Sequence, residues 1–356
     1  MSFWDSDGSA GIMVSSSYQR LPSRYYSALG RIVYSHLPDP QEFLKRTGIT
    51  AQMLRDPGGV ITLAQLDALI EAASRVSGSA HLGLELGRHA RLTEHGPLGY
   101  ALLCSGTLDE MLRLAARYYH LIVPVFKMRY ERRGSLAEIT FMPNAAMPRR
   151  TLHFFVEALA VSFQVQLDGV LGADSDGYEI YLSTDAPADV HRLLGNRFVR
   201  FRFGQRRIPG VTVKLATSSL DKPLPMANRP GMTAAAAQCE AIGGKQPDNR
   251  DLVKFVEMML HESEGILLTR SDVAASLKVT VRTLNRHLSN QGVTFRDVVQ
   301  RARSAQACAL LEEGNMTISQ IASRLGFSEV SNFSRWFRQY NGVSPTRYAN
   351  RYEPDW

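Results

Sequence analysis

Apolar residues recur most regularly near the C-terminus of the chain, between positions 318 and 348. The first set predicts a helix with one buried face and consists of Ile318, Ile321, Ala322 and Leu325. Gly326 follows at once, where a chain reversal needs the left-handed backbone that glycine readily adopts. A second helix is expected beyond it, with Ser328 as its cap. Its expected inner stripe is Val330, Phe333, Phe337 and Tyr340.

The outer face of this second helix is short, polar and cationic. It consists of Ser331, Asn332, Ser334, Arg335 and Arg338. A helix, a tight turn and a second helix with such a face are typical of a helix-turn-helix, which places its second helix in the major groove of DNA. One such match is a weak indication, because many helical pairs share the pattern.

The pattern occurs twice, which makes the indication strong. Val273-Ala274-x-x-Leu277-x-Val279 matches Ile321-Ala322-x-x-Leu325-Gly326-Phe327 at an offset of 48 residues. Leu284-x-Arg286-x-Leu288 matches Phe333-x-Arg335-x-Phe337 at an offset of 49. Between the copies, Phe295–Glu313 contains no Pro or Gly and predicts a helix roughly 28 Å long. Such a rod can hold two recognition helices about one DNA turn apart, near the ~34 Å repeat of the major groove.

Residues 249–351 resemble the DNA-binding domain of the AraC/XylS family of bacterial transcription regulators. The resemblance rests on the Gly326-Phe327 turn, the Phe333/Phe337 pair and Gly342-x-Ser344-Pro345-x-x-Tyr348. Lys278 departs from the family pattern, because the first turn often has glycine there. The resemblance implies base-reading positions at Arg282, Asn285, Arg286, Val330, Ser331, Asn332, Ser334 and Arg335. Candidate phosphate contacts are Arg338, Arg347 and Thr294.

The residue types at these positions suit base recognition. Arginine can bond guanine O6 and N7 together, and asparagine can bond adenine N6 and N7. The alternative interpretation is a solvated helix face, and Val330 and Ser334 could instead serve in packing or in phosphate contacts.

Net charge supports the same assignment. The chain carries +7, and residues 265–351 hold twelve Lys/Arg against five Asp/Glu, so the rest of the chain is neutral. A positive field confined to the segment with the paired motifs indicates binding to phosphate.

Upstream of this segment the sequence predicts an α+β domain. Helices are expected over Pro38–Thr47, Ala51–Arg55, Thr62–Ser77, Leu82–His89, Leu98–Cys104, Leu108–Ile122 and Leu152–Leu167. A hairpin is expected around Gly134, with further strands over Glu179–Ser183, 199–203 and 211–215. The sheet is expected to be antiparallel.

Residues 42–225 resemble, more loosely, the non-cupin ligand-binding domain of one branch of the same family. The supporting stretches are 54–57, 96–102, 107–108 and 220–225. The resemblance implies a sensor domain but does not name its effector, and the effector-binding residues are left open. The expected organisation is a disordered lead-in over 1–24, an effector-sensing or dimerisation domain over 25–225, a linker over 226–248, and a seven-helix DNA-binding domain over 249–356.

No catalytic signature and no metal-ligand spacing occur, so no enzyme, cofactor or metal is expected. His81, His89 and His95 do not stack on one helix face, which favours structural or surface histidines. A basic cluster comprises Arg197, Arg200, Arg202, Arg206 and Arg207. It is interpreted as the solvent-exposed face of a strand rather than as an anion-binding site or a domain interface.

A cytoplasmic location is expected. Cys104, Cys239 and Cys308 have no redox or metal spacing, and residues 1–20 lack the apolar core of a signal peptide. Leu152–Leu171 is not expected to span a membrane because it contains Glu157, Gln164, Gln166 and Asp168.

These features together predict a bacterial transcription regulator. The family resemblance, and nothing else, favours an activator over a repressor. Its expected partners are double-stranded DNA, RNA polymerase and a small-molecule effector, with a homodimer left open. Two alternatives remain at this point. The N-terminal domain could only dimerise, with DNA binding constitutive, or the chain could be an enzyme with an accessory DNA-binding module.

Overall fold

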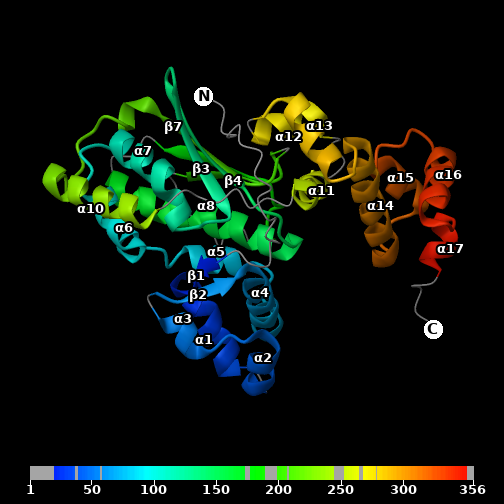
Figure 1. Cartoon of the computed structure of the whole chain (residues 1–356), viewed down its shortest axis with the longest axis horizontal. Helices are drawn as coiled ribbons and strands as arrows, with labels where there is room; N and C mark the ends of the chain where they lie inside the picture. The colour runs from blue at the N-terminus through cyan, green and yellow to red at the C-terminus, as the bar shows by residue number, and fades with distance from the viewer. Residues whose placement is uncertain are drawn as a thin grey trace.

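The computed structural model describes residues 20–36, 39–56, 58–172, 177–188, 199–206, 208–243, 252–263, 268–277 and 279–350. Figure 1 shows a larger α+β part, coloured blue to green, beside a helical part coloured yellow to red. This order confirms the expected fold class, in which helices with a sheet come first and helices alone follow.

The N-terminal part begins earlier than expected. β1 (Arg20–Pro22) pairs antiparallel with β2 (Val60–Thr62), and Leu21 is fully buried. A short 3-10 turn, η2 (Ser23–Tyr26), then leads into α1 (Ser27–His36). The expected lead-in is therefore wrong for residues 20–24, because strand pairing and burial tie them to the core. Residues 1–19 lie outside the described residues.

The further helices of the N-terminal part lie in segments that the apolar periodicity predicts, except the last one, which lies in the expected linker. They are α2 (Pro40–Thr47), α3 (Ala51–Arg55), α4 (Leu63–Ser77), α5 (Leu82–Gly87), α6 (Pro97–Leu103), α7 (Leu108–Tyr118), α8 (Arg149–Leu171) and α10 (Arg229–Ile242), with the 3-10 turns η3 (Leu92–His95), η4 (Tyr119–Leu121) and η6 (Thr217–Ser219). Thr62 and Thr107 cap α4 and α7 by accepting hydrogen bonds from the amides of Gln65 and Glu110.

The five-stranded sheet differs from expectation in one pairing. Its strands are β3 (Phe126–Arg133), β4 (Leu136–Pro143), β5 (Tyr178–Leu182), β6 (Val199–Arg202) and β7 (Val211–Ala216), in the order β3-β4-β7-β5-β6. The β3–β4 hairpin and the antiparallel pairing of most strands are confirmed, whereas β5 and β6 run parallel to each other. The segment 183–198 between them is long enough for the crossover that a parallel pair needs.

α8 is the central helix of the N-terminal part. It packs on α4, α5 and the sheet, and Phe154 and Phe155 are almost fully buried. By length and composition alone this helix could cross a membrane, a test that core helices also pass. Its Glu157 carboxylate is buried and lies 2.7 Å from Nδ1 of His81. Acidic side chains are rarely buried without a polar partner, and His81 is that partner here.

Two of the stretches that carry the N-terminal resemblance meet beside the sheet. The amide of Asp109 donates to the carbonyl of Leu220 at 3.0 Å, and the amide of Leu224 donates to the carbonyl of Gly106 at 3.0 Å. The start of α7 and residues 220–224 are therefore held together by backbone hydrogen bonds.

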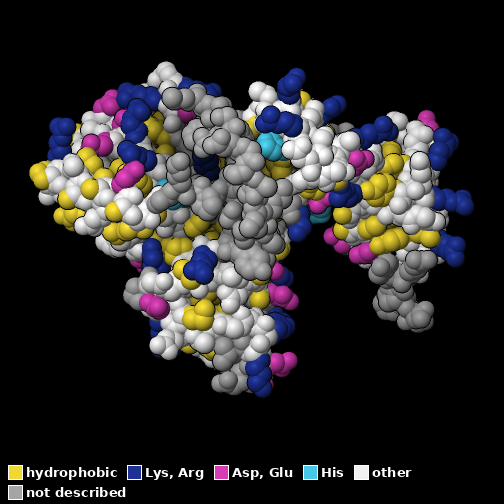
Figure 2. All heavy atoms as spheres, in the orientation of Figure 1, with side chains coloured by type: hydrophobic (Ala, Val, Ile, Leu, Met, Phe, Trp, Pro, Cys, Tyr) yellow, Lys and Arg dark blue, Asp and Glu magenta, His cyan; other side chains and the backbone are white. Residues whose placement is uncertain are grey.

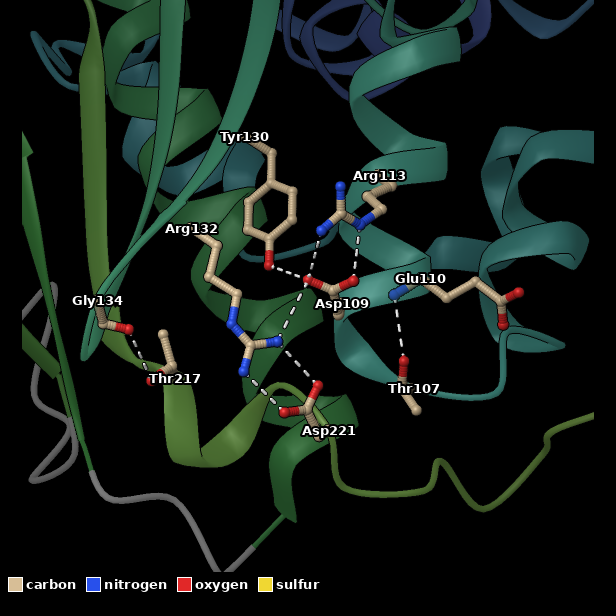
Figure 3. A network of polar contacts seen from close by, with 9 residues as sticks. All are labelled: Thr107, Asp109, Glu110, Arg113, Tyr130, Arg132, Gly134, Thr217 and Asp221. Atoms are coloured by element: carbon tan, nitrogen blue, oxygen red, sulfur yellow. Dashed lines mark hydrogen bonds and ion pairs between the residues drawn. The ribbon is translucent and has the colours of Figure 1, made fainter.

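Polar side chains reinforce this junction, as Figure 3 shows. The Asp109 carboxylate accepts hydrogen bonds from Arg113 at 2.7 Å and from the Tyr130 hydroxyl at 2.6 Å. Arg132 of β3 donates to Asp221 at 2.8 Å. The hydrogen bond from Arg113 is the main cause that lowers the pKa of Asp109. The network ties α7, β3 and the segment after β7 into one unit, which assigns these family stretches a structural role.

Much of the described part of the expected linker, residues 226–243, is helical. Asn228 caps α10 by accepting a hydrogen bond from the amide of Gly231 at 3.1 Å. α10 packs on α6, and Cys239 on its inner face is fully buried. Residues 229–242 thus belong to the N-terminal fold, whereas residues 244–251 lie outside the described residues.

The described C-terminal part contains the seven helices expected for it. They are α11 (Leu252–Glu262), α12 (Arg270–Leu277), α13 (Val281–Asn290), α14 (Phe295–Glu313), α15 (Ile318–Arg324), α16 (Val330–Asn341) and α17 (Pro345–Ala349). Their buried side chains form two clusters. The first joins α11, α12, α13 and the beginning of α14 and is continuous with the N-terminal core, whereas the second joins the end of α14 to α15 and α16.

α14 contributes to the two clusters from opposite faces. Val298 and Ala302 pack into the first cluster, and Ala307 and Leu311 pack into the second. At about 3.6 residues per turn, the step from Val298 to Ala307 is roughly two and a half turns, which reverses the face. The length and the twist of α14 therefore set how the two helix-turn-helix units are oriented relative to each other.

We expect Phe337→Ala to destabilise the second unit by about 3–5 kcal/mol, because it empties a fully buried aromatic site. Tyr340→Ala removes an exposed ring from the same helix and should change stability by less than ~1 kcal/mol. Urea titrations followed by circular dichroism measure both. Equal losses would show that burial in the second cluster does not hold α16 in place.

Candidate nucleic-acid interface

The two helix-turn-helix units close their turns in the same way. The amide of Val279 donates to the carbonyl of Ala274 at 3.0 Å, and the amide of Phe327 donates to the carbonyl of Ala322 at 2.9 Å. The donor and the acceptor of the second bond each lie 48 residues after their counterparts in the first, which is the offset of the sequence repeat. Gly326 has a φ of +78°, the left-handed conformation expected for this turn. The sequence repeat is therefore also a structural repeat.

α13 is the expected recognition helix of the first unit. Thr280 caps it, and Leu284 and Leu288 are fully buried on its inner face. The implied base-reading residues lie on the remaining surface, where Arg282 and Arg286 are exposed and Asn285 is half-buried. Lys278, the departure from the family pattern, lies outside the described residues.

α16 is the corresponding helix of the second unit. Of its expected outer residues, Ser331, Asn332, Arg335 and Arg338 are exposed and Ser334 is half-buried. The expected cap is wrong, because the residue at the N-cap is Glu329 rather than Ser328, and no side chain caps the helix. The carboxylate of Glu329 instead accepts a hydrogen bond from the Ser331 hydroxyl at 3.1 Å.

The buried stripe of α16 is narrower than expected. Phe333 and Phe337 are fully buried, but Val330 and Tyr340 are 38% and 45% exposed. Tyr340 stacks on Trp336 with ring centroids 6.1 Å apart. Its ring therefore packs on a neighbouring side chain at the surface of the helix and does not enter the core. Val330 thus lies with the outer residues of the helix.

The candidate phosphate contacts occupy different settings. Arg338 on α16 and Arg347 on α17 are exposed. Thr294 caps α14, and its hydroxyl donates to the Asp297 carboxylate at 2.7 Å. That hydroxyl already has a structural partner, whereas the two arginines point to solvent.

The arginines on the outer faces of α13, α16 and α17 form no ion pair with any residue in the described ranges. These arginines are Arg282, Arg286, Arg335, Arg338 and Arg347. Arginines of the N-terminal part are often paired, as Arg132 is with Asp221 and Arg150 with Asp67. Figure 2 shows Lys and Arg side chains along the outer side of the molecule that α16 forms. Unpaired cations leave their field available to a polyanion.

The first unit is docked on the N-terminal part through α8 and β3. Glu262 of α11 has one carboxylate oxygen 2.7 Å from Nε2 of His153 and the other 3.8 Å from Nε of Arg149. Both of these partners belong to α8. Arg129 of β3 donates to the carbonyl of Ser276, at the end of α12, at 3.2 Å. The position of the first unit therefore depends on α8.

The same helix forms one wall of a cavity of about 270 Å³ inside the N-terminal part. Its lining residues on α8 share one face and are Phe154, Phe155, Ala158, Leu159, Ser162, Phe163 and Gln166. The other walls come from η2, α1, the end of α5 with the turn after it, η3, η4 with the two residues that follow, and β4. Sequence reasoning left these residues open, because a helical stripe of apolar residues looks the same against a core as against a cavity.

The histidines and the clustered arginines of the N-terminal part occupy different settings. His81 pairs with Glu157, and His95 is buried beside the cavity. Among the described residues, no group of three or more His, Cys, Asp or Glu side chains could hold a metal. Arg200 and Arg202 are exposed on β6, as the interpretation as a solvent-facing strand predicts. Arg206 does not fit it, because it lies beyond β6 and its Nη1 is buried without a hydrogen-bond partner among the described residues. Arg197 and Arg207 lie outside the described residues.

Two similar helix-turn-helix units joined by one continuous helix define a DNA-binding transcription regulator. Comparison with family models agrees in both parts of the chain. Residues 38–208 match the arabinose-binding domain of AraC transcription regulators, and residues 273–351 match a helix-turn-helix domain. The chain belongs to the AraC family of transcription regulators.

Relatives extend over nearly the whole chain. The HTH-type transcriptional regulator Rv1395 of Mycobacterium tuberculosis, itself uncharacterized, is 29% identical over 87% of this chain and 90% of its own. The ornithine utilization regulator of Pseudomonas aeruginosa is 25% identical over 92% of this chain and 96% of its own. Among solved structures, the transcriptional regulator CdpR of Pseudomonas aeruginosa is 23% identical, with a TM-score of 0.43 over 90% of this chain and 97% of that one.

The docking contact generates a pH prediction. Burial alone raises the pKa of Glu262, but hydrogen bonds from His153 and His261, together with the nearby charges of His153 and Arg149, lower it to about 2. A lowered folded-state pKa stabilises the fold above the unfolded value near 4.5, and this contribution is lost as the pH falls toward 2. Glu262→Gln should therefore be less stable than the unaltered chain by roughly 2–3 kcal/mol at pH 7.

Urea titrations at pH 7, 4.5 and 3 measure this difference, which should shrink as the pH falls. Glu257→Gln on the same helix is the matched control, since Glu257 forms a more exposed pair with Arg301 and should change stability by less than ~1 kcal/mol. A loss in Glu262→Gln that stays constant from pH 7 to pH 3 would contradict the assignment.

Proposed function

We propose that the chain is a cytoplasmic, one-component regulator whose N-terminal domain binds a small-molecule effector. Its C-terminal domain, residues 249–356, reads double-stranded DNA with both helix-turn-helix units. The observation that best supports effector control is the double role of α8, which lines the cavity and also holds Glu262 of the first unit.

Effector control follows from this arrangement by population shift. A ligand in the cavity contacts one face of α8, and a small rotation or translation of α8 moves Arg149 and His153 relative to Glu262. A ligand that binds one position of α8 more tightly than another therefore also biases the position of the first unit. Because α14 connects that unit to the second one, the bias acts on the geometry that both units present to DNA.

The proposed base-reading set is the outer surface of α13 and α16: Arg282, Asn285, Arg286, Val330, Ser331, Asn332, Ser334 and Arg335. Arg338 and Arg347 are proposed to contact phosphates. The exposure of these arginines and their lack of ion pairs among the described residues support the assignment.

We further propose that the protein activates transcription, with RNA polymerase as a partner and a homodimer as the bound form. These proposals rest on the family alone. Transcription in vitro from a promoter that carries the binding site, with and without effector, tests activation, and analytical ultracentrifugation of the full chain on DNA tests the bound form.

Removal of a recognition arginine should reduce sequence preference. Arg286→Ala and Arg335→Ala should each lose roughly 1–3 kcal/mol of preference for a site selected from a random duplex library. Arg338→Ala should instead weaken binding to all sequences alike and reduce the salt dependence by about one phosphate contact. Fluorescence anisotropy over a salt series measures both quantities. Unchanged site preference in both recognition variants would show that these helices do not read bases.

A break in α14 should uncouple the two units. Ala305 is exposed, whereas Ala307 is fully buried in the second cluster, so Ala305→Pro tests the helix without disturbing a core. Proline at this position costs about 3 kcal/mol or more of helix stability and kinks the rod, and binding to the selected site should fall at least about 100-fold. Ala305→Ser is the matched control and should bind nearly as well as the unaltered chain. Equal affinities for the two variants would mean that the units bind DNA independently.

A further inference from the structure

The polar groups of the cavity gather where η2, η3 and η4 meet α8. Gln166 donates from its amide nitrogen to Nε2 of His95 at 3.1 Å, and Nδ1 of His95 lies 3.0 Å from the Tyr25 hydroxyl. Burial lowers the pKa of His95 to about 4, so the ring is neutral at pH 7. With Nε2 as the acceptor, Nδ1 carries the single proton and donates it to the Tyr25 oxygen. Arg24 donates to the same oxygen at 3.1 Å.

This chain of hydrogen bonds leaves the proton of the Tyr25 hydroxyl available to a further acceptor. Two more tyrosines line the same cavity, Tyr26 and Tyr119, and neither hydroxyl bonds to a residue within the described ranges. Burial raises the pKa of all three, so each stays protonated and is a donor at neutral pH. Donors in a largely buried site are stabilised by an acceptor, and these three hydroxyls have none among the residues that the structure describes.

The charged groups at the cavity favour an anion. Arg24 and Arg31 both line it, against the single carboxylate of Glu94. Arg31 is exposed and forms no ion pair with any residue that the structure describes, and it marks the side nearest to solvent. His95 contributes no charge because it is neutral. Acceptor oxygens that carry a negative charge fit both the tyrosine donors and the arginines.

Most of the remaining wall is apolar, and its polar members are Ser27, His89 and Ser162. The apolar part includes Phe141, Phe154, Phe155, Phe163, Ile122 and Leu159. A sugar would place hydroxyl groups against these side chains without partners, which is unfavourable. An aromatic ring or a short alkyl chain would instead bury apolar surface there.

We propose that the cavity binds a small organic acid, with its carboxylate at the tyrosine hydroxyls and arginines and its apolar body against the phenylalanines. This inference rests on the proposed effector control and specifies its ligand. A volume of about 270 Å³ lies near the lower end of ligand pockets, which suits a compact acid of this kind. The family model is named for arabinose, but the wall of this cavity favours an apolar acid over a sugar.

Binding to the full-length chain tests the ligand class. The probes are benzoate, phenylacetate and octanoate, the amide of each acid, and L-arabinose, measured by isothermal titration calorimetry. At least one acid should bind with a Kd below about 1 mM, and its amide should bind at least ten times more weakly. L-Arabinose should show no binding. If none of the acids binds, if an amide binds as tightly as its acid, or if L-arabinose binds instead, the assignment is wrong.

Matched variants test the site. Tyr119→Phe removes only a hydroxyl and should weaken the acid about ten-fold, whereas Tyr100→Phe alters an exposed tyrosine outside the cavity and should have no effect. Arg31→Gln should weaken the acid but not its amide, and Arg55→Gln, at an exposed arginine away from the cavity, should weaken neither. Affinities unchanged in both Tyr119→Phe and Arg31→Gln would place the acid elsewhere and overturn the proposal.

DNA affinity measured in the same samples separates this inference from the proposed function. An acid that binds the cavity but leaves DNA affinity unchanged supports the ligand assignment and contradicts effector control. A different small molecule that alters DNA affinity, while none of the acids binds, supports effector control and contradicts the ligand assignment.

Discussion

The organisation of the C-terminal half depends on one helix that is buried on two opposite faces. α14 supplies Val298 and Ala302 to the cluster of the first unit, and Ala307 and Leu311 to that of the second. An insertion of one residue between these pairs would rotate one face by about 100° relative to the other. Each core fixes its own side of the helix, so the relative placement of the two recognition helices follows from the packing of α14.

α8 has a comparable double role in the N-terminal half. One face lines the cavity, and the beginning of the helix holds Glu262 of α11 through His153 and Arg149. The first unit therefore shares its hydrophobic core with the N-terminal domain, whereas the second unit has a cluster of its own. In the proposed mechanism, an effector shifts the first helix-turn-helix unit, and α14 transmits the change to the second unit.

The sequence predicted what periodicity and local chemistry encode. The duplicated turn, the long helix and the β3–β4 hairpin each follow from the spacing of residues that are close together in the sequence, and the structure confirms them. The parallel pairing of β5 and β6 and the contact of Glu262 with His153 depend on residues far apart in the chain. The cavity could not be predicted either, because its polar groups come from several turns and helices that only the fold brings together. The base-reading role of the outer arginines stays a prediction.

The central claim is that one chain reads two successive major grooves at a spacing set by α14. Methylation interference at guanine N7 on a site selected by the full-length protein tests it most directly, because N7 lies in the major groove. The account predicts two clusters of interfering guanines per bound chain, on one face of the duplex and about 10 base pairs apart. A single cluster would contradict it, since only one of the two units would then read DNA.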